Sequence, residues 1–141
     1  MHGVDAGRQF CHTGAACIGW CGHKAAADFS VAGNMLVGPA VLEAMGEAFT
    51  APEAAKLLLA ERLLRALEAG QAAGGDQRGR QSAALLVASP APRMHHNVRV
   101  DDHADPVAEL RRVHDLLIEH EQSIEREYGP QALRAFGRVK Y

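Results

Sequence analysis

The sequence has few aromatic residues, no excess of charge of one sign and no long apolar run. Aromatic residues make up 5% of its 141 positions, and the formal net charge at pH 7 is -2. A chain that binds nucleic acid through a basic surface or a row of stacked rings has more of both. No apolar stretch approaches the roughly 18 residues that a membrane-spanning helix needs. We therefore expect no nucleic-acid partner and no membrane partner.

Cysteine is scarce as well, and its three copies lie close together. Cys11, Cys17 and Cys21 fall within 11 consecutive positions. An odd number in one short stretch is a poor disulfide framework for a secreted domain. The first residues have neither the charged nor the apolar region of a secretory signal. These features predict a reduced compartment, the cytoplasm.

What remains is the composition of a globular domain, with 48% hydrophobic and 23% charged residues. A chain of this length buries roughly two-thirds of its unfolded surface, which suffices for a core. We expect one domain over residues 1–128, followed by a C-terminal tail or short helix over residues 129–141. The turn signal Asp5-Ala6-Gly7 comes first, ahead of the first predicted strand.

Four strands are predicted from alternating or continuous apolar residues between turn signals. They span residues 8–13, 28–36, 81–88 and 97–101. Residues 14–22, rich in Gly and Ala, are expected to form a loop that holds Trp20. Strands in pairs with helices grouped between them predict an α+β fold with antiparallel or mixed sheets.

Three helices are predicted from capping residues and apolar stripes. The first opens at Gly38-Pro39, and the second opens at the capping box Thr50-Ala51-Pro52-Glu53 and ends at Gly70. The third runs from Asp105-Pro106 to Gly129-Pro130. Four glutamates on the third helix are expected to form a solvated face: Glu119, Glu121, Glu125 and Glu127.

Four ordered blocks carry a resemblance to a known family. They are His12-Thr13-Gly14-Ala15-Ala16-Cys17 with Trp20, Gly33-Asn34-Met35-Leu36, residues 69–85, and Val98-Arg99-Val100-Asp101-Asp102-His103 with Asp105-Pro106. These blocks resemble domain-of-unknown-function family 1028, a bacterial and archaeal family with an Ntn-hydrolase-like fold. The resemblance implies αββα layers with antiparallel sheets. Family members carry further N-terminal strands, so we expect only the C-terminal portion of the domain and an incomplete sandwich.

The superfamily's enzymes hydrolyse amides with an N-terminal Thr, Ser or Cys whose own amine is the base. Neither Met1 nor His2 can serve, and freeing the amine of Thr13 would remove a strand, so no catalytic residue is assigned. We expect a non-catalytic binding or assembly module. The alternative is one half of an amide or peptide-bond hydrolase of the N-terminal-nucleophile type, whose nucleophile lies on a missing N-terminal segment or a partner chain.

Residues 74–79, Gly74-Gly75-Asp76-Gln77-Arg78-Gly79, are the strongest candidate for a binding loop. Successive glycine N–H groups can bind an anion, and Arg78 or Arg80 can pair with a carboxylate. A tight loop with an Asp76–Arg78 or Asp76–Arg80 surface pair is the simpler interpretation. For a small carboxylate or amide ligand, the candidate residues are His12, Thr13, Trp20, Asn34, Gly74, Gly75, Asp76 and Arg78.

We expect no metal and no cofactor. Cys17, Cys21 and His23 lack the spacing of a known structural zinc site and have no second ligand pair downstream. Because exposed sheet edges need a partner or protection, we expect a homo-oligomer or a partner chain that completes the sheets.

Overall fold

The computed structural model describes residues 2–5 and 8–132, which fall into two compact units, Met1–Arg80 and Gln81–Tyr141. Each unit combines antiparallel strands with α-helices, which confirms the predicted α+β class. Within the described residues the strands form three separate two-stranded sheets. Positions 6 and 7 of the predicted turn, and positions 133–141 of the predicted tail, lie outside the described residues.

Two hairpins make up the sheets of the first unit. Strand β1 (His2–Asp5) pairs with β2 (Arg8–Cys11), and β3 (Trp20–Ala25) pairs with β4 (Ser30–Leu36). The β3–β4 register shifts between Trp20 and Gly22, as at a β-bulge. The expected loop over residues 14–22 was therefore wrong at its end, because Trp20 pairs with Leu36 and begins a strand.

Two helices and a short 3-10 turn complete this unit. Helix α1 is Ala40–Thr50, η1 is Ala54–Lys56 and α2 is Leu59–Ala72. The predicted capping box was wrong, since the Thr50 hydroxyl donates back to the carbonyl of Gly46 and belongs to the end of α1. The prediction that this helix ends at Gly70 was also wrong. It is buried inside α2, where a Cβ would lie 2.7 Å from Cγ of Met45.

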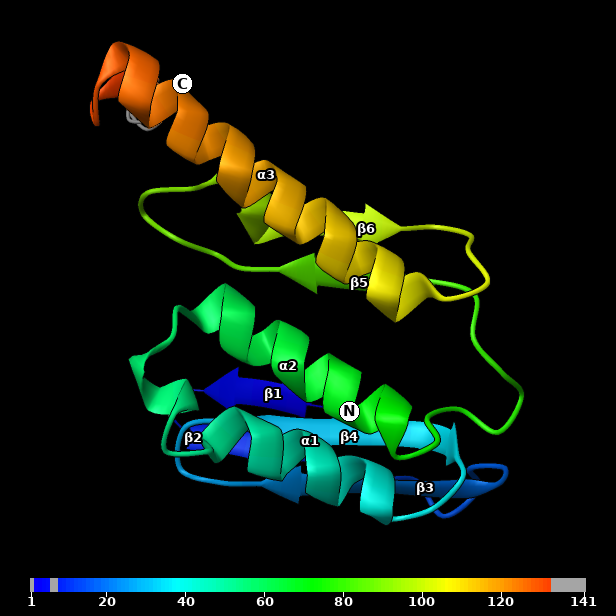
Figure 1. Cartoon of the computed structure of the whole chain (residues 1–141). Helices are drawn as coiled ribbons and strands as arrows, with labels where there is room; N and C mark the ends of the chain where they lie inside the picture. Colours follow the sequence, from blue (N-terminus) through cyan, green and yellow to red (C-terminus); the bar gives the residue numbers. More distant parts are fainter. Residues whose placement is uncertain (1, 6–7, 133–141) are drawn as a thin grey trace. The chain divides into compact units, whose positions relative to one another are not determined.

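Helix α1 packs on one face of the β3–β4 hairpin (Figure 1), and no described helix of the first unit packs on the other, which is called the bare face below. Residues directly opposite each other in an antiparallel pair share a face. Val31 is buried on the face toward α1, where Lys24 Nζ and Phe29 lie close to Gly46. On the opposite face every residue is exposed, namely His23, Ala25, Ser30, Ala32 and, further along β4, Asn34.

The second unit repeats this arrangement with one helix. Strand β5 (Ala83–Leu86) pairs with β6 (Asn97–Val100), and helix α3 (Pro106–Tyr128) packs against the hairpin (Figure 1). A 3-10 turn, η2 (Met94–His96), leads into β6. The paired residues Leu85 and Val98 are buried, whereas the other face of the hairpin is exposed.

Helix α3 has the predicted ends. Pro106 occupies the first turn after Asp105, and Gly129 closes the helix with a φ of 83°, a conformation that suits glycine. The carboxylate of Asp105 makes no side-chain capping bond, so only the position of the cap was correct. Within the described residues, no helix combines the length and the hydropathy that crossing a bilayer requires.

Candidate functional site

The segment between β2 and β3 folds back onto the middle of β3. The Thr13 hydroxyl is hydrogen-bonded to Nδ1 of His23, with 2.7 Å between the two atoms. Gly19, directly before β3, has a φ of 72°, and a Cβ there would clash with Nε2 of Gln77. The positive φ favours glycine at this position, and the close approach places the folded segment against the loop of residues 74–79.

That glycine-rich loop is joined to the end of β4 by main-chain hydrogen bonds. The amide of Gln77 donates to the carbonyl of Met35 at 2.8 Å, and the amide of Val37 donates to the carbonyl of Gly75 at 3.1 Å. Asp76 forms an isolated antiparallel bridge with Leu36. The loop thereby extends the β3–β4 sheet by a short bridge, on the side of β4 away from β3.

Three glycines of this loop, Gly74, Gly75 and Gly79, have backbone conformations that other residues rarely adopt. Gly74 has a φ of 113°, and a Cβ would lie 2.6 Å from a methyl of Val37. Gly75 has a φ of 60° beside the side chain of Gln71. The loop's shape therefore depends on glycine both for the left-handed conformation and for packing against β4.

Asp76 and Arg78 pair with each other, as the simpler interpretation of the loop predicted. Arg78 donates from its main-chain amide and from Nε to Oδ1 of Asp76, and from Nη2 to Oδ2 at 2.6 Å. The side-chain bonds from Arg78 and the bond from its amide lower the pKa of Asp76 to about 2. Any ligand carboxylate at Arg78 would have to compete with this internal carboxylate.

The structure brings only some of the remaining predicted ligand-binding residues close together. Trp20 is half-buried and its ring covers Gly22, where a Cβ would come 2.8 Å from the ring. Asn34 is exposed on the bare face of β3–β4, next to Met35, whose carbonyl binds the loop. His12 is exposed and its ring stacks on that of Phe10 at 6.4 Å. Thus Thr13 and the loop both contact the β3–β4 hairpin that contains Trp20, and their ligand-binding role stays a prediction.

Metal-ligating residues are dispersed in the part of the chain that the structure describes. There, no group of three or more His, Cys, Asp or Glu side chains could hold a metal ion. The three cysteines are thiols rather than disulfides. His23, the possible third member of a Cys17–Cys21 set, is instead engaged by Thr13.

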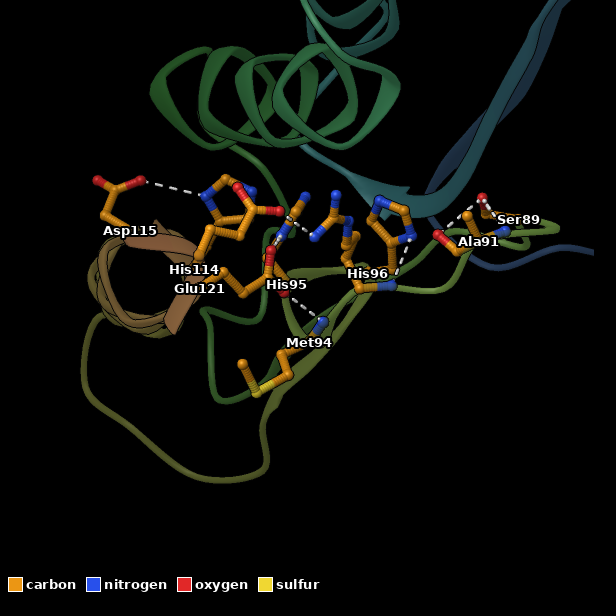
Figure 2. A network of polar contacts seen from close by, with 10 residues as sticks. Ser89, Ala91, Met94, His95, His96, His114, Asp115 and Glu121 are labelled. Carbon is orange, nitrogen blue, oxygen red and sulfur yellow. Dashed lines mark hydrogen bonds and ion pairs between the residues drawn. The ribbon is translucent and has the colours of Figure 1, made fainter. Parts of the chain in front are cut away.

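A buried polar cluster in the second unit was not predicted from the sequence. Glu121 of α3 accepts hydrogen bonds from the amide of Met94 and from Nδ1 of His95, the latter at 3.0 Å (Figure 2). His95 and Glu121 are both 6% exposed, and His114 is 1% exposed. The rings of His95 and His114 meet edge to face at 5.5 Å. The cluster ties α3 to the turn η2 that precedes β6.

The expectation of a solvated glutamate face on α3 was therefore wrong for Glu121. Glu125, one turn on, is half-buried and accepts a hydrogen bond from Nη1 of Arg93 at 2.8 Å. A helical period alone cannot distinguish a buried carboxylate from a solvated one. The only signal in the sequence was the His95-His96 pair, which supplies a partner for a buried acid.

His96 lies at the edge of the buried cluster formed by His95, His114 and Glu121. Its Nδ1 accepts a hydrogen bond from the amide of Arg93 at 3.3 Å, and its ring meets that of His95 at 4.6 Å (Figure 2). Burial and the neighbouring His95 lower the pKa of His96 from its ordinary value of 6.5. Nε2 of His95 and Nε2 of His114 are buried without a hydrogen-bond partner.

Comparison with known proteins gives two similarities. Residues 1–110 match the model of a family described as a family of unknown function, DUF1028. No curated protein matches this chain. Among solved structures, the chain is similar to protein SPO2555 from Silicibacter pomeroyi, described with the same family model, at 35% sequence identity and a TM-score of 0.66. The match covers 77% of this chain and 45% of that one, so the chain spans less than half the length of that relative.

Proposed function

This chain belongs to the DUF1028 family, and from that premise we propose that it is a non-catalytic binding or assembly module with an Ntn-hydrolase-like αββα layering. The observation that supports this proposal most strongly is that two of its hairpins are each covered by helix on one face and bare on the other. A two-stranded hairpin rarely persists alone, because it needs further strands or a second packed layer.

The bare face of β3–β4 is suited to close packing against another sheet. Its exposed residues are small or polar, with Ala25 and Ser30 at the turn end of the hairpin and Ala32 further along β4. Small side chains allow two sheets to approach closely, and facing sheets are packed about 10 Å apart. The outer edges of the hairpin also carry main-chain groups that can pair with further strands.

The bare face of β5–β6 is more apolar. Leu86 is 73% exposed on it, and its neighbours Ala84, Asn97 and Arg99 are exposed as well. An exposed leucine at the end of a strand costs little by itself, but here it lies on a face that no described helix of the second unit covers. Such a face is expected to be buried in the functional assembly.

We propose a second copy of this chain as the partner. The matched region is 45% of the Silicibacter pomeroyi chain, so two copies of it amount to most of the length of that relative. The small net charge of -2 opposes self-association only weakly. A symmetric dimer uses the same face twice, which places each bare sheet against its equivalent.

Sedimentation equilibrium of the full chain and two variants tests this assignment. Ala32→Arg places a long cation at the centre of the bare β3–β4 face, and Ala55→Arg makes the same change at an exposed position of η1. We expect the wild type and Ala55→Arg to dimerise and Ala32→Arg to dissociate at least about tenfold more readily. A monomeric wild type, or equal behaviour of the two variants, would contradict the proposal.

The alternative is one half of an amide or peptide-bond hydrolase completed by a different polypeptide. The hydrogen bond between the Thr13 hydroxyl and Nδ1 of His23 favours it, because a hydroxyl beside an imidazole can contribute to acyl-transfer chemistry. The amine of Thr13 lies in a peptide bond, so the N-terminal nucleophile would come from the partner. Isolation of a heteromeric complex whose partner begins with Thr, Ser or Cys would favour this alternative over the homodimer.

The glycine-rich loop is the part of the module to which we assign a small carboxylate or amide ligand. Its main-chain geometry and its nearness to the folded segment of Thr13 and Trp20 support this assignment. Ligand-observed NMR with small carboxylates and amides tests it, with Arg78→Ala as the variant. Binding that is weakened in Arg78→Ala supports the assignment, whereas binding that is unchanged removes Arg78 from the site.

A further inference from the structure

The turn η2 and the residue before it hold the C-terminal half of α3. Nη1 of Arg93 donates to Oε1 of Glu125 at 2.8 Å. The amide of Met94 and Nδ1 of His95 are both hydrogen-bonded to the carboxylate of Glu121 (Figure 2). The two glutamates lie one helical turn apart, so these bonds reach a single face of α3. We call this set of contacts the η2 clasp.

The two halves of α3 are held in different ways. Pro106, Val107 and Leu110 are buried in the N-terminal half, where the helix packs on β6. After His114, Glu121 is the only buried residue among those described in the helix, and the apolar side chains are half-buried or exposed. Apolar burial does not depend on pH, whereas a hydrogen bond to a titratable group does. The C-terminal half therefore depends on the clasp.

His96 closes the clasp through a pair of reciprocal bonds. Its amide donates to the carbonyl of Arg93 at 3.1 Å, and the amide of Arg93 donates to Nδ1 of His96 at 3.3 Å. Its carbonyl accepts from the amide of Val87 at 2.7 Å, which ties the turn to the segment after β5. Because Nδ1 is an acceptor, the neutral ring carries its proton on Nε2, and a second proton has to go to Nδ1. That proton breaks the bond from the Arg93 amide.

The surroundings of His96 also oppose a positive charge on its ring. The groups that face it are Arg93 and His95 beside it in the chain, and His114 and Glu121 of α3. The ring of His95 lies 4.6 Å from that of His96. Glu121 is the one carboxylate in this set, and it is already bonded within the clasp. A proton on His96 thus adds a cation next to the permanent charge of Arg93.

We propose that the η2 clasp is a pH-sensitive device, in which a proton taken up by His96 opens the turn and releases the C-terminal half of α3 from the β5–β6 hairpin. Burial, with His95 as the next cause, lowers the pKa of His96 in the closed state. The clasp is therefore closed above the ordinary pKa of 6.5 and opens as the pH falls through the lowered value. This local opening requires neither the assembly nor the ligand described above.

Hydrogen exchange of the full chain at pH 7.5 and 5.5 tests the device, with each rate divided by the intrinsic rate at that pH. We expect residues 115–128 to be less protected than residues 106–113 at both values, because they open locally. Their protection should fall by about three- to tenfold at pH 5.5, about tenfold being the limit for one proton. Helix α1, which contains no histidine, should change by less than about twofold. Equal protection of the two halves of α3 at pH 5.5, or no fall, would overturn the proposal.

Two glutamine variants identify the group that takes up the proton. The side-chain oxygen of glutamine accepts a hydrogen bond but does not titrate, so His96→Gln should retain the clasp and lose the pH dependence. His120→Gln, at an exposed position of α3, should keep the wild-type fall. A wild-type fall in His96→Gln would overturn the proposal.

NMR titration of the wild-type histidine rings supplies a measurement that needs no variant. The loss of protection over residues 115–128 should have the same midpoint as the titration of His96, below 6.5. A midpoint near the ordinary glutamate value of about 4.3 would assign the opening to Glu121 or Glu125 instead and would contradict the role of His96.

Discussion

The two units use polar side chains in opposite ways. In the first unit the chemically versatile residues lie at the surface, where Thr13, His23, Asp76 and Arg78 are held by a hairpin and a glycine-rich loop. In the second unit the carboxylate of Glu121 and the rings of His95 and His114 are buried beneath α3. The first arrangement leaves groups available for a partner, whereas the second uses them to hold one helix on one hairpin.

The contrast shows where each unit is sensitive to substitution. Glycine conformations and main-chain bonds shape the surface of the first unit, so side-chain losses there should cost little stability. The buried cluster of the second unit has few alternative partners, so a single loss leaves donors unpaired inside the protein. Four substitutions or conditions, taken from the largest expected effect to the smallest, test this contrast.

Glu121→Ala should give the largest loss of stability. It removes the acceptor of the Met94 amide, which is part-buried, and of Nδ1 of His95, which is buried. We expect the free energy of unfolding of the second unit to fall by about 2–4 kcal/mol. Hydrogen exchange of the α3 amides measures it. Glu119→Ala, at an exposed position of the same helix, should change the value by less than about 0.5 kcal/mol. Equal effects would refute a structural role for the cluster.

Gly74→Ala should have the next largest effect, and it acts on the first unit. The substitution meets both an unfavourable φ of 113° and the methyl of Val37, and should cost about 2 kcal/mol. Gly79→Ala has a similar φ of 110° but nothing within 4 Å, so strain alone should cost about 1 kcal/mol. Urea unfolding followed by the fluorescence of Trp20, which is the chain's one tryptophan, gives both values. A costlier Gly79→Ala would contradict the packing of the loop on β4.

Mild acid should weaken the second unit by a smaller amount. Because burial lowers the pKa of His96 in the folded state, the unfolded chain takes up a proton first as the pH falls. The stability from neutral His96 is therefore complete above its ordinary pKa of 6.5 and is lost as the pH falls through the lowered value. Unfolding measured at pH 7.5 and 5.5 should show this loss, and His96→Gln should reduce it. A loss of the same size in His96→Gln would assign the effect to other groups.

Arg78→Ala should leave stability almost unchanged, because the Asp76–Arg78 pair is open to solvent. Its effect should appear in the carboxyl of Asp76, whose pKa should rise from about 2 toward the ordinary value of 3.8. NMR titration of that carboxyl measures the change. Arg80→Ala serves as the comparison and should leave the pKa of Asp76 low. If the pKa of Asp76 rose equally in Arg80→Ala and in Arg78→Ala, Arg78 would not be the only residue that lowers it.

The sequence predicted the regular elements best where the signals were local. Asp105-Pro106 and Gly129 gave both ends of α3, and alternation gave β4 and β6. Strand β3 was missed because Trp20–Ala25 contains glycine and no apolar alternation, and its pairing with β4 is what makes it a strand. Thr50 was misassigned because a hydroxyl can bond forward as a cap or backward to the preceding helical turn.

The candidate site could be predicted only as a set of separate pieces. The run Gly74-Gly75-Asp76-Gln77-Arg78-Gly79 indicated a loop and an Asp76–Arg78 pair, which are local features. Its attachment to Met35 and Gly19 depends on tertiary contacts that no spacing encodes. The burial of Glu121 likewise depends on η2, which lies more than twenty residues earlier in the chain. The family resemblance was confirmed, whereas the Ntn-hydrolase-like layering remains a proposal.

Native mass spectrometry of the intact chain, purified gently from its host, tests the assembly of the bare hairpin faces most directly. If the chain is the proposed module, we expect the spectrum to show an uncut homodimer that persists as the protein is diluted into the low micromolar range. A monomer at every concentration would contradict the assignment of the two bare faces to a partner copy. A complex with a different polypeptide would contradict it as well and would direct the search for a nucleophile to that partner's N-terminus.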